Sequence, residues 1–137
     1  MLISIYNKKH KIKKKWQFNQ FLDIIKFGFY GIQTLESGFL LKNQFETIRF
    51  LVNRIIKRTG GLFIRIFFIH SITKKPLKSR MGKGVGSIQS WIAIIKKGII
   101  LFEITNISKQ LALILYKAIT NFVSFKVNFI IRDFIDY

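Results

Sequence analysis

The chain has 137 residues, of which 24 are lysine or arginine and 6 are aspartate or glutamate, and its formal net charge is +18 at pH 7. Half of its residues are hydrophobic and none is cysteine, which excludes an intrinsically disordered chain, disulfides and thiolate metal sites. The length predicts one folded domain at residues 27–137, preceded by a basic arm at residues 1–26. The cationic excess predicts RNA or DNA as a partner, because each neutralised phosphate of a nucleic acid releases counterions.

The basic arm contains the sequence KKHKIKKK at residues 8–15. In so basic a chain this run favours an RNA-contacting arm over a solvated tail. Its candidate contacts are Lys8, Lys9, Lys11, Lys13, Lys14 and Lys15. The first sixteen residues contain no arginine and no cleavage-site pattern, which is atypical of a transit peptide. We therefore expect the protein to be made in the compartment where it works.

The domain is predicted to begin with a strand and a helix. Residues 27–35, FGFYGIQTL, combine aromatic residues with two glycines, which indicates a strand with a bulge or a close backbone approach. Residues 42–58 predict a helix, whose apolar stripe comprises Phe45, Ile48, Val52, Ile55 and Ile56. Its flank carries Arg49 and Lys57, which could contact phosphates or belong to a solvated face. The following Thr-Gly-Gly sequence is expected to end the helix through residues with positive φ.

Residues 62–68, LFIRIFF, predict a buried strand in which Arg65 is the single charged position. A loop at residues 69–90 follows and contains the candidate phosphate site, TKKPLKSRMGKGVG. Its cations are Lys74, Lys75, Lys78, Arg80 and Lys83, and its glycines are Gly82, Gly84 and Gly86. Because glycine has no side chain, these positions let the backbone approach a crowded polyanion. The spacing matches neither a nucleotide-binding P-loop nor a dinucleotide fingerprint.

The last third of the chain predicts a hairpin, a helix and a strand. Residues 91–96 and 99–105 resemble two strands joined by a two-residue turn that ends in glycine. Ser108 is expected to cap a helix that extends to about residue 121, with an apolar stripe of Leu111, Ile114 or Leu115, Ala118 and Phe122. Residues 125–131 predict the final strand. This order of elements favours an α+β fold with a mainly antiparallel sheet and two helices.

Enzymatic and membrane functions have little support in the sequence. The six acidic residues are scattered, the two histidines stand alone, and no metal-ligand cluster is present, so we expect no catalytic residue, metal or cofactor. No apolar run approaches the roughly 20 residues of a membrane-spanning helix, so no membrane insertion is expected. Two alternatives stay open, a basic peripheral membrane-surface protein and, with less support, a free RNA-processing enzyme.

Several motifs in order resemble one family. They are the strand around Arg65, the TKKPL segment at residues 73–77, RMGKG at 80–84 followed by Gly86, and WIA with LFEI at 91–93 and 101–104. From about residue 27 to residue 132 the chain resembles the bacterial and organellar type of large-subunit ribosomal protein L-sixteen. This resemblance implies a hammerhead-type α+β fold and a position on large-subunit rRNA near the aminoacyl-tRNA site. It also implies that the glycine-rich loop, including Met81, points toward tRNA acceptor ends, with other ribosomal proteins as neighbours.

The chain departs from the family pattern in places. Val85 replaces a lysine of the loop, Leu41 replaces a threonine that caps the first helix, and Phe68 replaces a proline. Lysine outnumbers arginine about three to one, and isoleucine, phenylalanine and asparagine are abundant, as AT-rich codons would dictate. This bias favours a mitochondrial ribosome, with a plastid or an AT-rich bacterium as the alternative. The additional apolar residues, such as Phe39, Phe50, Phe134 and Ile135, reflect either this bias or a contact surface for neighbouring proteins.

Overall fold

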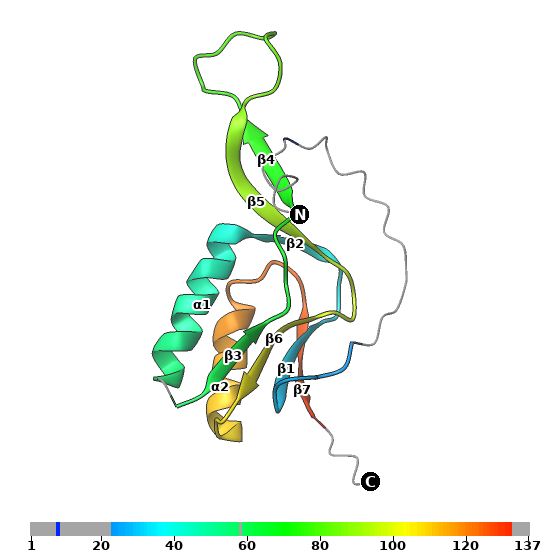
Figure 1. The fold of residues 1–137 in the computed structure, drawn as a ribbon, viewed down its shortest axis with the longest axis vertical. Helices are drawn as coiled ribbons and strands as arrows, with labels where there is room; N and C mark the ends of the chain where they lie inside the picture. The colour runs from blue at the N-terminus through cyan, green and yellow to red at the C-terminus, as the bar shows by residue number, and fades with distance from the viewer. Residues whose placement is uncertain (1–7, 9–22, 58, 133–137) are drawn as a thin grey trace.

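The structure is a computed structural model that describes residue 8 and residues 23–57 and 59–132. Two helices and two antiparallel sheets make up the described part (Figure 1). The elements are β1 (Tyr30–Thr34), β2 (Gly38–Leu41), α1 (Lys42–Ile56), β3 (Gly61–Ile64), β4 (His70–Lys74), β5 (Ser87–Ile95), β6 (Ile100–Thr105), α2 (Lys109–Thr120) and β7 (Val127–Ile131). The predicted α+β class with antiparallel pairing is confirmed.

The larger sheet has the strand order β3-β6-β1-β7. Its register is set on β1, where Ile32 pairs with Phe102 of β6 and with Phe129 of β7. The register between β1 and β6 shifts after Ile32, which confirms the irregularity predicted for this strand. Gly28 and Gly31 allow close packing, since a Cβ on Gly28 would lie 2.9 Å from Glu103 Cβ.

The smaller sheet has the order β2-β5-β4 and carries a hairpin that projects from the body of the molecule (Figure 1). β4 and β5 pair from His70 with Ile92 to Lys74 with Ser87. The second half of β5 pairs with β2, next to the start of α1. The hairpin is therefore anchored at its base, and its tip is the segment 75–86 between the two strands.

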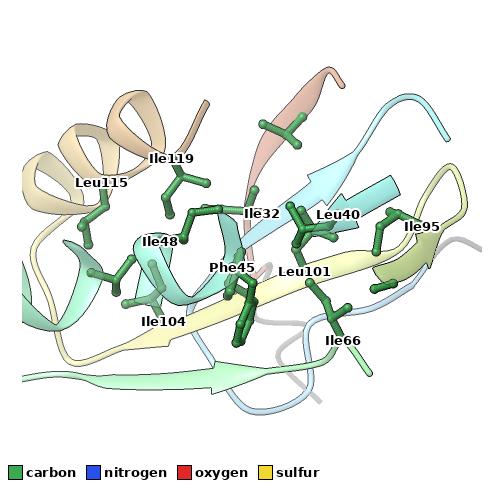
Figure 2. Close-up of a cluster of buried hydrophobic side chains, with 14 of the residues drawn as sticks. Ile32, Leu40, Phe45, Ile48, Ile66, Ile95, Leu101, Ile104, Leu115 and Ile119 are labelled. Carbon is green, nitrogen blue, oxygen red and sulfur yellow. The ribbon is translucent and has the colours of Figure 1, made fainter. Parts of the chain in front are cut away.

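The hydrophobic core lies between the sheets and the two helices (Figure 2). The predicted stripe of α1 is confirmed, because Phe45, Ile48, Val52 and Ile56 are buried. Phe45 stacks on Phe102 of β6 with ring centroids 5.7 Å apart. Leu41 at the N-cap has no capping side chain, and its N–H instead donates to Gln44 Oε1 at 3.1 Å. The carboxamide of Gln44 thus serves the N–H of the N-cap residue, which is one half of a capping box, while the half that a threonine side chain would supply is missing.

Helix α1 ends differently from the prediction. Lys57 takes the left-handed conformation, with φ 48°, and its N–H donates to Asn53 O at 3.2 Å. Neither glycine of the Thr-Gly-Gly sequence has a positive φ. Gly60 instead meets a close approach, because a Cβ there would lie 2.6 Å from Thr105 O and 2.7 Å from Ile107 Cγ2. This glycine lets the chain turn tightly against the end of β6.

The predicted hairpin of residues 91–96 and 99–105 is wrong, because β5 and β6 belong to different sheets. The turn between them does contain a glycine with positive φ, Gly98 at 87°. However, Gly98 N–H donates to Thr34 O at 2.8 Å and Thr34 Oγ1 donates to Lys96 O at 2.7 Å. The turn therefore docks on the end of β1 and transfers the chain from one sheet to the other.

Three further predictions need correction. Residues 69–90 are not a continuous loop, since they include β4 and the start of β5. The strand predicted at 62–68 is a short edge strand, β3, and Phe63 and Phe67 beside it are exposed rather than buried. Helix α2 buries Ala112, Leu115 and Ile119, so its inner face is rotated from the predicted stripe. Apolar residues lie on almost every side of this helix, so hydrophobic periodicity alone could not show which face is buried.

Two local predictions for the last third are confirmed. Ser108 caps α2, with its Oγ accepting from Leu111 N–H at 3.4 Å. The final strand is β7, within the predicted range. Neither α1 nor α2, the helices of the described residues, is long and apolar enough to cross a membrane.

Candidate nucleic-acid interface

The loop at the tip of the β4–β5 hairpin comprises residues 75–86 and stands away from the core (Figure 1). Two apolar side chains show how far it projects, because Leu77 is 97% exposed and Met81 is 96% exposed. The loop surrounds a hollow of about 550 Å³ that is lined by Lys75, Pro76 and residues 79–86. The sequence thus places the predicted glycines and most of the predicted cations on one projection.

The backbone of the loop depends on left-handed residues. Gly82, Lys83 and Gly84 follow one another with φ angles of 98°, 54° and 80°. A Cβ on Gly82 or Gly84 would meet nothing within 4 Å, so conformation and not crowding favours glycine there. The backbone of these two residues is uncovered, and the approach of a polyanion to it stays a prediction.

Gly86 has a different role at the neck of the hairpin. A Cβ on this residue would collide with the carbonyl of Lys74 and lie 2.7 Å from Lys75 N. The two strands can approach each other here because residue 86 has no side chain. The three glycines of the motif therefore divide into two that shape the tip and one that closes its base.

The cations of the loop are also not equivalent. Lys75 Nζ donates to Gly82 O at 2.9 Å and so ties one side of the loop to the other. Ser79 N–H donates to Pro76 O at 3.1 Å and forms a turn on the opposite side. In the described part of the chain, the four remaining cations are exposed, and their side chains form no hydrogen bond or ion pair with the protein. They are Lys74, at the end of β4, and Lys78, Arg80 and Lys83 in the loop.

Arg49 and Lys57 lie on α1 and are not brought to the loop. Arg49 forms an ion pair with Glu46 at 2.8 Å and its guanidinium carbon lies 5.2 Å from the centre of the Phe50 ring. Lys57 is the exposed C-cap of α1, at the end of the helix remote from the hairpin (Figure 1). Any phosphates that these two residues contact therefore belong to a second surface.

Arg65 is held inside the protein. Its guanidinium donates to Asp23 Oδ1 at 2.7 Å, to Glu103 Oε1 at 2.8 Å and to Ile24 O at 2.8 Å, and its side chain is 17% exposed. These contacts fasten the segment before β1 to the sheet. The rRNA contact expected of Arg65 stays a prediction, and the contacts present give this residue a structural role.

Glu103 is the centre of this network. The carboxylate is fully buried and accepts hydrogen bonds from the backbone N–H groups of Lys26, Phe27 and Gly28 at 2.6–3.3 Å. Burial by itself raises the pKa of Glu103, but these N–H groups and the Arg65 guanidinium outweigh it and lower the pKa. Glu103 is therefore a carboxylate at neutral pH and fixes the entry of the chain into β1.

Of the lysine run at residues 8–15 in the basic arm, the structure describes one residue. Lys8 is exposed, and its Nζ donates to Val85 O of the loop at 3.5 Å. Lys9, Lys11, Lys13, Lys14 and Lys15 lie outside the described residues. In the described ranges, no group of three or more histidine or acidic side chains could hold a metal ion.

Comparison with known proteins identifies the family. The family model of ribosomal protein L16p/L10e matches residues 4–130. The chain is 43% identical over 107 residues to the large ribosomal subunit protein uL16 of Protochlamydia amoebophila, covering 76% of this chain and 77% of that protein. It is 44% identical over 109 residues to uL16 of Chlamydia pneumoniae, with 75% and 78% covered. The chain belongs to the ribosomal protein L16p/L10e family.

Membership confirms the resemblance and decides the class of function. The protein is a structural constituent of the large ribosomal subunit and not an enzyme. Its partners in the family context are rRNA and other ribosomal proteins. The relatives named above are bacterial, and the mitochondrial location stays a prediction.

Sequence reasoning missed the network of Asp23, Arg65 and Glu103. A signal was present, because Arg65 and Glu103 are each the one charged residue in an otherwise apolar run. A charge in such a run must find a partner when the run is buried. Opposite charges in two predicted strands therefore could have indicated that β3 and β6 are neighbours.

Proposed function

We propose that the protein binds large-subunit rRNA near the aminoacyl-tRNA site and directs the loop of residues 75–86 toward the acceptor ends of tRNA. The observation that carries this proposal is the projection of the loop, with two uncovered glycines and three cations, Lys78, Arg80 and Lys83, whose side chains bind no described residue. A projecting loop can reach a second RNA while the body of the protein stays on the first.

The chemistry is positioning and needs no catalytic side chain. Lysine and arginine bind phosphate oxygens, and a backbone without side chains can follow the RNA closely. Arg80 is suited to bidentate phosphate recognition because its guanidinium is planar. Val85 removes one charge that the family usually has in the loop, so fewer cations share the contacts at the tip.

Attachment to rRNA is assigned to the other cationic regions. The arm, with Lys8, Lys9, Lys11, Lys13, Lys14 and Lys15, concentrates charge next to the domain. The contact of Lys8 with Val85 supports an arm that lies near the hairpin. Arg49 and Lys57 supply a further contact surface on α1.

The cellular location is proposed to be a mitochondrial ribosome, with a plastid or AT-rich bacterial ribosome as the alternative. The support is the lysine-, isoleucine- and asparagine-rich composition. Cell fractionation, with the protein detected by an antibody raised against it, would test the location. Recovery with bacterial-type ribosomes outside mitochondria would contradict the location and leave the ribosomal function intact.

The tRNA contact is tested with the double variant Arg80→Ala, Lys83→Ala. We expect the variant to co-sediment with the large subunit and to bind aminoacyl-tRNA at least about tenfold more weakly, because one charged hydrogen bond contributes roughly 1.5–3 kcal/mol. The matched control is Lys96→Ala, Lys97→Ala, which removes two exposed cations at the turn between β5 and β6. Unchanged tRNA binding in the loop variant would refute the tRNA contact.

A binding experiment with the wild-type protein distinguishes attachment to rRNA from the alternative of attachment to a membrane surface. Binding of the wild-type protein to rRNA and to vesicles of anionic lipid is compared at matched salt. We expect rRNA to bind more tightly. Stronger binding to vesicles would favour a peripheral membrane function instead.

A further inference from the structure

The larger sheet has an open edge along β3. In the described part of the chain, β3 pairs with β6 on one side and with no strand on the other. Arg65 N–H donates inward to Leu101 O at 3.2 Å. Because neighbouring residues of a strand point their backbone groups to opposite sides, Leu62 and Ile64 direct theirs outward. β3 thus presents free backbone donors and acceptors to a further strand.

Apolar side chains surround this edge. Phe67 is 78% exposed, Ile24 73%, Phe27 60%, Phe63 41% and Ile64 40%. Phe27 and Phe63 stack with ring centroids 5.5 Å apart, and Ile24 is tied to the same place through Arg65. We call these five residues the apolar edge. Exposed apolar residues gathered at one sheet edge, two of them in contact, indicate a contact surface.

Charge distinguishes the class of partner. In a chain with a net charge of +18, the stretch from Thr59 to Ile69 has Arg65 as its one cation, and both Asp23 and Glu103 pair with it. Lys26, on the segment beside Phe27, and Arg132, whose guanidinium donates to Lys26 O at 3.3 Å, add two cations nearby. Around β3 itself the one cation, Arg65, is paired with two carboxylates, so this edge lacks the concentrated positive charge that binding to phosphates favours. A protein is the matching partner.

We propose that the apolar edge binds an extended, predominantly apolar segment of a neighbouring ribosomal protein, which adds a strand to β3. Its backbone would complete the hydrogen bonds of Leu62 and Ile64, and alternate side chains would cover Phe63 and Phe67. The inference rests on the proposed function, since it assumes that the chain is part of the large subunit. It adds a defined protein contact at the open edge of the larger sheet, separate from the cationic loop.

The experiment places the photo-crosslinking amino acid benzoylphenylalanine at position 67 of the full chain, assembled into large subunits. The subunits are purified, irradiated and digested, and the crosslinked peptide or nucleotide is identified by mass spectrometry. We expect a crosslink to one segment of one neighbouring protein. The matched control has the same amino acid at position 50, because Phe50 is 65% exposed but lies beside the cation Arg49. That position should not give the same product.

A second measurement tests the added strand itself. Ile64→Pro removes an outward N–H and leaves the inward N–H groups of Phe63 and Arg65 in place, as an edge strand tolerates. The crosslink yield from position 67 should fall roughly two- to tenfold in this variant, the equivalent of one hydrogen bond, and stay unchanged in Ile64→Val. If Ile64→Pro does not enter the subunit, Phe27→Glu, which alters an exposed side chain, takes its place.

The outcomes separate this inference from the proposed function. A crosslink from position 67 to rRNA, to the arm of the same chain, or to no neighbour within subunits that contain the protein would overturn the protein contact alone. A wild-type chain that does not enter the large subunit would overturn both. A crosslink to one protein segment that weakens in Ile64→Pro supports the added strand.

Discussion

At the scale of single residues, a few polar groups determine how the domain is fastened. Glu103 has no exposed surface, and it gathers three backbone N–H groups and the guanidinium of Arg65. The segment that these groups belong to connects the basic arm to β1. The network therefore links the basic arm, for which RNA binding is proposed, to the core without exposing a charge.

Replacing Glu103 with glutamine should change how stability depends on pH. The pKa of Glu103 is lowered from 4.5 on folding, so the carboxylate stabilises the native state above pH 4.5 and this contribution is lost as the pH falls through the lowered pKa. At neutral pH Glu103→Gln should cost about 3–5 kcal/mol, because the charge of Arg65 loses a buried partner. The difference from the wild type should shrink below pH 4.5. Urea unfolding across this pH range measures both effects.

The matched control for this prediction is Glu36→Gln. Glu36 pairs with Lys126 at 3.3 Å, but the side chains are 50% and 78% exposed. Exposed pairs of this kind contribute about 0–1 kcal/mol. Two results would show that burial does not determine the contribution of Glu103. One is a loss of stability in Glu36→Gln as large as that in Glu103→Gln, and the other is a loss in Glu103→Gln that stays constant as the pH falls.

Substitutions of two loop glycines by alanine should have distinct effects. Gly82→Ala places a Cβ in open space and costs about 1 kcal/mol through its positive φ, with the change confined to the loop. Gly86→Ala places a Cβ against the Lys74 carbonyl and should separate β4 from β5. Hydrogen exchange of the strand amides measures this. Equal exchange in the two variants would contradict the division of roles.

At the scale of elements, the sequence predicts correctly those features that depend on residues close together in the chain. The stripe of α1 and the Ser108 cap are correct because each depends on residues within a few positions of one another. The hairpin of β5 and β6 is wrong because Thr34, more than sixty residues away in the chain, holds the turn against β1. Pairing partners are chosen by tertiary contacts that a local pattern does not contain.

The candidate site shows the same limit. The loop motif locates the tip correctly, but the sequence predicts a loop where the strands that carry the tip lie. β4, with the sequence HSITK, and the start of β5 pair mainly with each other, outside the core, and their alternation of apolar and polar residues is weak. The residue types of the motif therefore identify the candidate functional residues, whereas the sequence of the supporting strands does not clearly predict β-structure.

The strands of the β4–β5 hairpin should be rigid, and its tip should be mobile. Backbone amides that pair between His70–Lys74 and Ser87–Ile92 are held by the ladder, whereas few backbone bonds hold residues 75–86. We expect the strand amides to exchange at least about tenfold more slowly than those of the tip, since local opening costs more where hydrogen bonds are paired. Hydrogen exchange with mass spectrometry measures this. Uniformly fast exchange over residues 70–92 would show that the strands do not position the loop.

At the scale of the whole molecule, positive charge and apolar surface are separated. The cationic loop lies at one end of the long axis, and the apolar edge, where Arg65 is paired with two carboxylates, lies along β3 on the body (Figure 1). In a chain with a net charge of +18, pairing Arg65 internally keeps its charge away from the apolar edge. If the proposed protein contact holds, the internal network serves both the fold and the choice of partner.

The cations of the arm and those of the loop should differ in their effect on salt dependence. Replacing the six arm lysines, Lys8, Lys9, Lys11, Lys13, Lys14 and Lys15, with glutamine should weaken binding to rRNA. It should flatten the slope of log K against log salt by about 0.7–0.9 for each phosphate that the arm no longer neutralises. Replacing Lys78, Arg80 and Lys83 should leave attachment and slope near the wild type, because these residues are assigned to tRNA. Filter binding over a salt series, with sedimentation of assembled subunits, measures both sets. An unchanged slope in the arm variant together with a flattened slope in the loop variant would reverse the assignment, and rRNA binding would then depend on the hairpin tip.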